Sequence, residues 1–215
     1  MVIRFFEDPN DTNLFPLTST RPAAALRIGI VTIAEKWMLD LGANSCAYKT
    51  KDYLQQRFPN KEATIEINGH LIPSAELIQA ISELPKDASL YTAEELCLAR
   101  KGNGSQKVQF GNKPILITRP YHIFKLNGAE IKNDFERLTK NRTSQLLSKT
   151  NTHIGDYPIF LEEGAQVECC IFNTQQGPIY IGKNAQIMEG SIIRGPFAMG
   201  EGSNIKMGSK IYRDT

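Results

Sequence analysis

A six-residue repeat near the end of the chain restricts its fold more than any other feature. From position 181 an aliphatic residue returns at every sixth place: Ile181, Ile187, Ile193, Met199, Ile205 and Ile211. The fifth place of each hexad holds Ala185, Ser191, Phe197, Ser203 and Ser209, which are small except for the phenylalanine. A period of six fits neither a flat strand, with a period of about two, nor an α-helix, with about 3.6. It predicts a coil of three short strands, each turning one aliphatic side chain inward.

Residues 161–166 and 167–172 fit the same frame upstream, and two extra residues within 173–180 then shift the register. Three hexads make one coil, so 161–180 and 181–198 form two coils and 199–215 most of a third. Stacked coils bury the aliphatic column and pair the backbone between coils, whereas scattered strands of a β-sandwich are the alternative. The pattern resembles the hexapeptide-repeat family, whose members form left-handed parallel β-helices and usually trimerise. Many of them are acyltransferases.

The end of the repeat carries an expectation of its own. Residues 199–215 contain no atypical unit to cover the last coil, which repeat stacks normally need. We therefore expect the native protein to continue with further hexads after Thr215. The resemblance implies that such coils would hold the acyl-CoA site and a catalytic histidine, because no histidine follows His153, which we place in a linker.

The first 150 residues show a different pattern, in which strand and helix signals alternate. Strands are expected at 2–6, 63–67, 89–91 and 115–117, and helices at 28–41, 74–84 and 130–140. Such alternation predicts an α/β domain, here of a Rossmann-type three-layer kind. We assign residues 1–150 to this head and 151–215 to the left-handed parallel β-helix. Residues 141–152 are expected to be the linker.

Leu14-Phe-Pro-Leu-Thr18, followed by Pro22 and Leu26, resembles the start of sugar-1-phosphate nucleotidyltransferases. In that family a strand and a Gly-x-Gly-Thr-Arg phosphate loop run into Leu-x-Pro-Leu-Thr. The Asn68-Gly69 dipeptide is similar to the family's Gly-Asp metal segment. A head of this kind before hexapeptide repeats resembles the bifunctional N-acetylglucosamine-1-phosphate uridyltransferase/acetyltransferase family. The resemblance implies a nucleoside triphosphate and a sugar phosphate as substrates, with Mg²⁺ as a cofactor.

The residues that should perform this chemistry are altered. The aligned phosphate loop reads Pro9-Asn-Asp-Thr-Asn13, so its glycines and arginine are gone and the carboxylates Asp8 and Asp11 replace them. Glycine lets backbone amides wrap a phosphate, and Pro9 has no amide hydrogen. The family's Pro-Lys reads Pro22-Ala23, which removes a cation. Its metal aspartate reads His70, a poor magnesium ligand, so ordinary pyrophosphorylase chemistry is in doubt and no metal ligand or catalytic residue is assigned.

Other residues near these positions are the candidates for binding. On the nucleotide and phosphate side the candidates are Asp11, Thr12, Arg21, Arg27 and Lys36. The alternative for the three cations is that they are surface charges or pair with Glu7, Asp8, Asp11 or Glu35. On the sugar side the candidates are Asn68, Gly69 and His70, although His70 also suits a polar turn. His122 fits the start of a helix better than the role of a base.

The net charge and the cysteines indicate which partners and which compartment to expect. Twenty-five basic against 23 acidic residues leave a net charge of +2, so no strong field indicates nucleic acid or an anionic membrane. The four cysteines have no CxxC spacing, and free thiols indicate a reducing cytoplasm. Cys169 and Cys170 are adjacent, so one is expected to point into the coil and the other outward.

Three functions remain open. The first is a sugar-nucleotide-forming or acyl-transferring enzyme that assembles as a homotrimer through its β-helix. The second is a non-catalytic head that packs onto or regulates a hexapeptide-repeat acyltransferase. The third is a module that binds a sugar phosphate without turnover.

Overall fold

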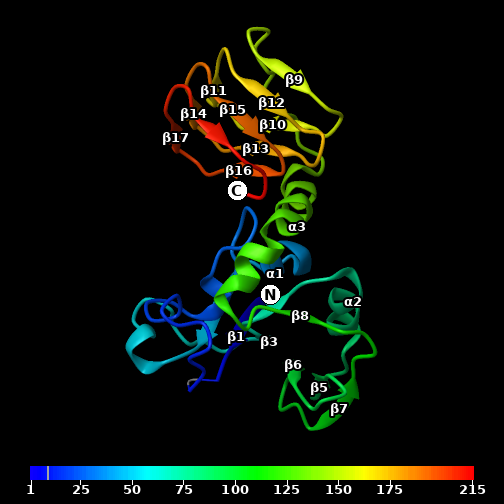
Figure 1. Cartoon of the computed structure of the whole chain (residues 1–215). Helices are drawn as coiled ribbons and strands as arrows, with labels where there is room; N and C mark the ends of the chain where they lie inside the picture. Colours follow the sequence, from blue (N-terminus) through cyan, green and yellow to red (C-terminus); the bar gives the residue numbers. More distant parts are fainter. Residues whose placement is uncertain (9) are drawn as a thin grey trace. The chain divides into compact units, whose positions relative to one another are not determined.

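The computed structural model describes residues 1–8 and 10–215 (Figure 1). Pro9, whose missing amide hydrogen counts against a phosphate loop, lies outside the described residues. Backbone contacts divide the chain into two compact units. The first comprises Met1–Arg27 and Val31–Ile123, and the second comprises Ile28–Ile30 and Phe124–Thr215. The domain limits 1–150 and 151–215 stay a prediction.

A six-stranded mixed sheet organises the first unit, in the order β2-β1-β3-β6-β5-β7. Strand β1 is parallel to β2 and to β3, β6 is antiparallel to β3 and β5, and β7 is parallel to β5. The bounds are β1 Val2–Phe6, β2 Ser45–Lys49, β3 Ile65–Asn68, β5 Ala88–Tyr91, β6 Cys97–Lys101 and β7 Gln106–Gln109. Antiparallel β4 (Leu71–Ile72) and β8 (Ile115–Leu116) form a small second sheet. The predicted α/β class of the head is confirmed.

Two helices of the first unit begin at clear capping residues. Helix α1 spans Ile33–Leu41 and starts at Thr32, which forms a capping box with Glu35. It ends at Gly42 in a left-handed conformation, as expected. The prediction of a helix from residue 28 was wrong, because Gly29 has a φ of +75° and Thr32 caps a later start. Helix α2 spans Ala75–Glu83 after the N-cap Ser74. Short 3₁₀ helices cover Ala23–Ala25 and Asp52–Leu54.

Helix α3 spans Pro120–Thr139, ten residues more at its start than the predicted 130–140. Pro120 suits the first helical position, where no amide hydrogen is needed. Gly128 weakens the helical signal in the sequence, but a Cβ there would overlap the Asp214 carboxylate of the same unit. Close packing therefore accounts for the glycine inside the helix. No helix within the described ranges is long and apolar enough to cross a membrane.

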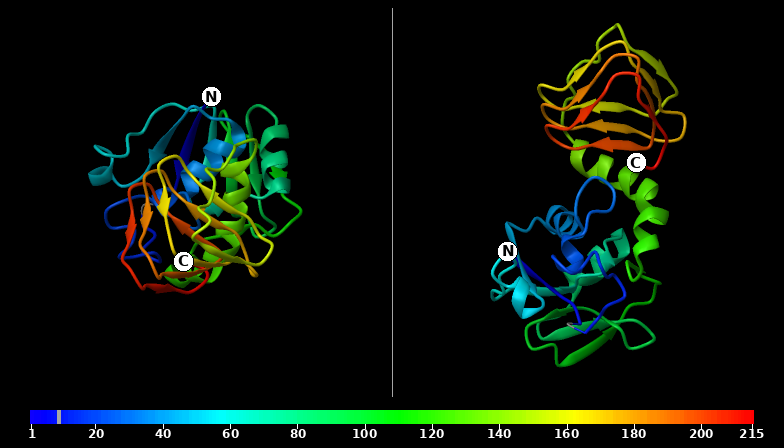
Figure 2. Two further views of the ribbon diagram at one scale, coloured as in Figure 1. Left: turned by 90° about the horizontal axis from the view of Figure 1, so that it is seen from above. Right: turned by 60° about the vertical axis from the view of Figure 1, so that its left-hand side comes forward.

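Three parallel sheets form the β-helix of the second unit, with strands stacked in register (Figure 2). Their orders are β10-β13-β16, β11-β14-β17 and β18-β15-β12-β9, an arrangement consistent with a left-handed β-helix. Ile159 pairs with Ile179 and Ile179 with Phe197, so the coils advance by 20 and then by 18 residues. The predicted coils and the two-residue excess are thus confirmed. The bounds are β9 Thr152–Ile154, β10 Ile159–Leu161, β11 Gln166–Val167, β12 Ile171–Asn173, β13 Ile179–Ile181, β14 Gln186–Ile187, β15 Ile192–Arg194, β16 Phe197–Met199, β17 Asn204–Ile205 and β18 Lys210–Ile211.

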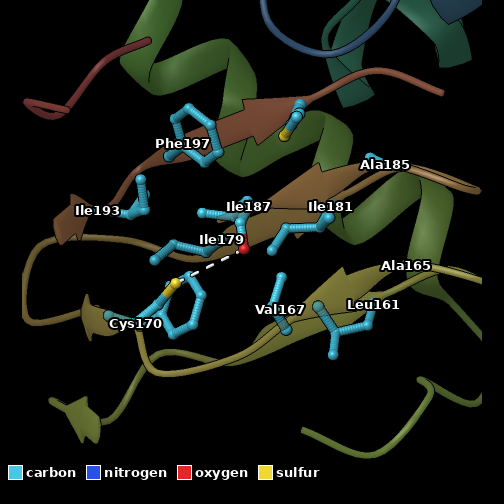
Figure 3. Packing of buried hydrophobic residues seen from close by; sticks show 12 residues of the cluster. Leu161, Ala165, Val167, Cys170, Ile179, Ile181, Ala185, Ile187, Ile193 and Phe197 are labelled. Atoms are coloured by element: carbon cyan, nitrogen blue, oxygen red, sulfur yellow. Dashed lines mark hydrogen bonds between the residues drawn. The ribbon is translucent and has the colours of Figure 1, made fainter. Parts of the chain in front are cut away.

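The predicted aliphatic column is the core of this β-helix (Figure 3). Ile181, Ile187 and Ile193 are almost completely buried, and Ile205 and Ile211 pack against the same cluster. Cys170 lies inside the coil and Cys169 is exposed, as the alternating pattern predicts. Ala185 and Ser191, small residues at the fifth place of their hexads, are completely buried.

Residues 144–151, termed here the cap segment, hold the first coil through side chains. The Ser144 hydroxyl accepts from the Leu161 amide at 2.9 Å. The Gln145 side chain accepts from the Gly164 amide and donates to the Ala165 carbonyl. Asn151 donates to the Val167 carbonyl and accepts from the Cys170 amide. This stretch joins α3 to β9 (Thr152–Ile154), as expected of the linker, and its amide and hydroxyl side chains also pair the backbone edge of the coil.

A polar network fixes the aromatic face of the first coil. Arg142 pairs with Glu162, and the Tyr180 hydroxyl donates to the same carboxylate. The Arg142 guanidinium lies 5.3 Å from the Phe160 ring, which stacks on Tyr180. Burial and the bond to Glu162 raise the pKa of Tyr180 to about 12. Burial opposes ionisation of Glu162, but the bonds from Arg142 and Tyr180 hold its pKa below the usual 4.5.

Glu162→Gln is expected to flatten the acid side of the stability profile. A carboxylate whose pKa is lowered by folding stabilises the folded state when the pH is above the ordinary pKa of 4.5. That contribution is lost as the pH falls through the pKa of the group in the folded state. The free energy of unfolding, measured in urea from pH 6 to pH 3, should therefore fall less steeply in the variant. Glu163→Gln, at a neighbouring exposed position, is the control and should keep the wild-type slope. Equal slopes in all three proteins would contradict the assignment.

Candidate functional site

A cavity of about 450 Å³ lies where the parallel strands β1, β2 and β3 of the first unit end. Ligands of open α/β sheets bind outside the carboxyl ends of such strands. Its wall contains the last residues of these strands, Phe6, Lys49 and Asn68. The other lining residues are Glu7, Asp8, Asp11, His70, Leu96, Cys97, Arg100, Leu116 and Thr118.

The acidic loop after β1 is closed by its own carboxylates. Asp8 accepts a hydrogen bond from the Asn10 amide at 2.9 Å, and Asp11 accepts one from the Asn13 amide at 2.8 Å. The Asp11 amide donates to the Asp8 carbonyl at 3.0 Å. These are the local turns that aspartate favours. The amides of Asn10, Asp11 and Asn13 are therefore engaged within this loop and are not directed at a phosphate.

The turn after β3 brings the sugar-side candidates to the cavity. The Asn68 side chain donates to the Cys97 carbonyl and accepts from the His70 amide, both at 3.1 Å. Gly69 donates its amide to the Phe6 carbonyl and is not among the lining residues. The His70 Nδ1 lies 2.8 Å from the Ile117 carbonyl oxygen. Asn68 and His70 thus line the cavity from a rigid turn.

Two cations that the sequence analysis missed line this cavity. Arg100 on β6 lies over the Phe6 ring at 4.6 Å, and its Nε is 3.9 Å from a Glu66 oxygen. Both neighbours hold the guanidinium by charge and stacking. Lys49 is the exposed last residue of β2. Short motifs do not reveal this pair, because its position depends on the order of the strands in the sheet. Strand β6, which carries Arg100, lies beside β3 although it comes much later in the sequence.

The predicted nucleotide-side residues are spread over several places. Asp11 lines the cavity, and its Oδ2 lies 3.7 Å from His70 Nε2, so the structure brings these two candidates together. Thr12, Arg21 and Arg27 are exposed and do not line it. Lys36 lies on α1, as expected, but is completely buried there. His122 lies in the first turn of α3, and His153 lies on β9 rather than in a linker.

The residues that line the cavity decide whether it can hold Mg²⁺. Among the residues that the structure describes, no three His, Cys, Asp or Glu side chains are grouped to hold a metal ion. Mg²⁺ usually takes one or two protein carboxylates and completes its shell with water and substrate phosphate. The carboxylates of Asp8 and Asp11 on the cavity wall fit that mode of binding. The site therefore combines carboxylates, an amide, an imidazole and two cations, which suits a polar phosphorylated ligand.

Comparison with known proteins gives the family. A search of curated proteins found no match to this chain. Residues 3–143 match the family described as sugar nucleotidyl transferase. The match includes β1 except Val2, all of β2, β3 and β6, and every residue that lines the cavity. The chain therefore belongs to the sugar nucleotidyl transferase family.

Proposed function

We propose that the chain joins a nucleoside triphosphate to a sugar 1-phosphate in this cavity and releases pyrophosphate. One observation carries the proposal: Lys49 and Arg100 face a cavity at the carboxyl ends of the sheet strands in a chain of this family. The family's phosphate loop is replaced here, so the phosphates need other donors. A planar guanidinium and an ammonium are the side chains best suited to them.

Several polar residues on the cavity wall have a role in this reaction. An oxygen of the sugar phosphate attacks the α-phosphorus of the triphosphate, a new P–O bond forms, and the bond to the β-phosphate breaks. Negative charge collects on the departing pyrophosphate, which Lys49 and Arg100 stabilise. Asn68 and His70, held by the turn after β3, orient the sugar phosphate.

Magnesium would be held mainly by Asp8, because Asp11 faces His70. When bound, the ion neutralises charge on the phosphates. The acidic loop would then contact the nucleotide phosphates through the bound Mg²⁺ and not through the backbone amides of the loop.

Arg100→Gln is expected to weaken the binding of UTP or dTTP with Mg²⁺ by about tenfold or more, because one charge-assisted hydrogen bond contributes about 1.5–3 kcal/mol. Lys49→Met should act in the same direction. Isothermal titration measures the affinity, and pyrophosphate release with sugar 1-phosphates measures turnover. Arg21→Gln, at an exposed position outside the cavity lining, is the matched control. A loss confined to the Arg21 variant would contradict the proposed site.

A non-catalytic head is the second candidate, and the closed acidic loop favours it. Its amides at Asn10, Asp11 and Asn13 already donate within the loop. A wild-type protein that binds no nucleotide and no sugar phosphate, with or without Mg²⁺, would support this candidate against the enzyme.

We also propose that the protein assembles as a cytoplasmic homotrimer through the sides of its β-helix. The three parallel sheets give each coil three flat sides, which suit closed cyclic packing. All four cysteines are free, as in a reducing compartment. Light scattering of the purified chain tests the assembly, and a monomer would exclude it.

A further inference from the structure

A small chamber beside the cavity is lined almost entirely by polar side chains of the first unit. Its volume is about 10 Å³, and its walls are Glu7, Asp8, Asp11, Leu14, Thr18, Lys51 and His70. A single water molecule needs about this much space. The proposed function uses the neighbouring cavity and assigns no role to this chamber.

The Thr18 hydroxyl requires a partner in this chamber. Thr18 is 7% exposed, and its Oγ1 is buried without a hydrogen-bond partner among the described residues. Leaving a buried hydroxyl unpaired costs about 1–3 kcal/mol. Because Thr18 forms part of the chamber wall, a small polar group inside the chamber can supply the missing bond.

His70 and Asp11 also require a hydrogen-bond donor in this chamber. The Ile117 carbonyl can only accept, so His70 Nδ1, at 2.8 Å from it, carries the hydrogen. In the neutral ring Nε2 is then an acceptor, and it faces Asp11 Oδ2 at 3.7 Å. Two acceptors at this distance repel each other unless one donor beside them binds both.

The other charged groups of the chamber have different partners. Glu7 accepts from the Thr50 hydroxyl and from the Ala23 amide, and Asp8 accepts from the Asn10 amide. The Lys51 ammonium lies 4.1 Å from the centre of the Phe15 ring. The demand for a donor is therefore greatest between His70 and Asp11.

We propose that the chamber holds one water molecule, which donates to His70 Nε2 and Asp11 Oδ2 and accepts from the Thr18 hydroxyl. Three hydrogen bonds are usual for a buried water. This water joins the acidic loop, the segment at Thr18 and the turn after β3, and so holds one wall of the cavity. The inference stands whether or not the chain transfers nucleotides.

A crystal structure of the full chain at about 1.5 Å, grown with sodium and with rubidium salts, tests the occupant. We expect one peak that refines as water within about 2.6–3.2 Å of the three named atoms, without rubidium scattering. A chamber with no peak, or a rubidium signal in it, would overturn the proposal.

Thr18→Val distinguishes an unpaired Thr18 hydroxyl from one that is bonded to water, because the two cases change the stability in opposite directions. Valine keeps the shape, so it relieves an unpaired hydroxyl but removes a bond from a bound water. We expect a lower urea midpoint for the variant than for the wild type. Thr12→Val removes an exposed hydroxyl from the acidic loop and should leave the midpoint unchanged. An unchanged or raised midpoint in Thr18→Val would count against the water.

Discussion

Gly29→Ala is expected to lower the free energy of unfolding by about 2–5 kcal/mol. Gly29 has a φ of +75°, and its amide donates to the Asn127 side chain at 2.8 Å. A Cβ at this position would lie 2.7 and 2.8 Å from backbone atoms of Glu130 on α3. Backbone atoms of a helix cannot move aside cheaply, so the clash adds to the strain of the left-handed conformation. Urea denaturation followed by circular dichroism measures the loss.

Gly42→Ala is the matched control for this prediction. Gly42 also has a positive φ, +61°, but nothing lies within 4 Å of the position its Cβ would take. This variant bears only the conformational cost of about 1–2 kcal/mol. If the two variants lose the same stability, the close approach of Gly29 to α3 is not the cause.

Phe172→Ala is expected to destabilise the β-helix by about 3–5 kcal/mol, because it leaves a cavity in a closed core. Phe172 on β12 is completely buried in the cluster that contains Ile187 and Ile193. Its neighbour Ile171 is 38% exposed on the outward side of the same strand, so Ile171→Ala is the control and should cost much less. Thermal unfolding of the two variants compares the sides directly. Equal losses would mean that the inward column does not dominate the stability of the coil.

The sequence predicts the β-helix well because its period is local. From Ile181 onward each inward residue is followed six places later by the next, so no long-range contact is needed to recognise the coil. Even the 20-residue first step is visible as a two-residue excess. The cap segment escaped recognition because its role depends on side chains that replace backbone partners. A run of Ser, Gln, Thr and Asn has the same composition in a loop.

The candidate site could be predicted only in part. Asn68 ends β3, and His70 and Asp11 lie in the loops after β3 and β1, so their place at the carboxyl edge follows from the parallel order. Arg100 could not be assigned because its place depends on the antiparallel return of β6. Lys36 is a candidate because it lies downstream of the acidic loop in sequence, but it is buried on α1, and burial is decided by packing that no short motif records.

The cap segment determines where this stack of coils can grow by duplication. A coil inserted between β13 and β16 would replace backbone pairs with identical backbone pairs, since the strands there lie 18 residues apart and pair in register. A coil inserted before β10 would instead separate Ser144, Gln145 and Asn151 from the amides and carbonyls that they match. The number of coils can therefore change within the stack, while its first coil keeps a fixed distance in sequence from α3.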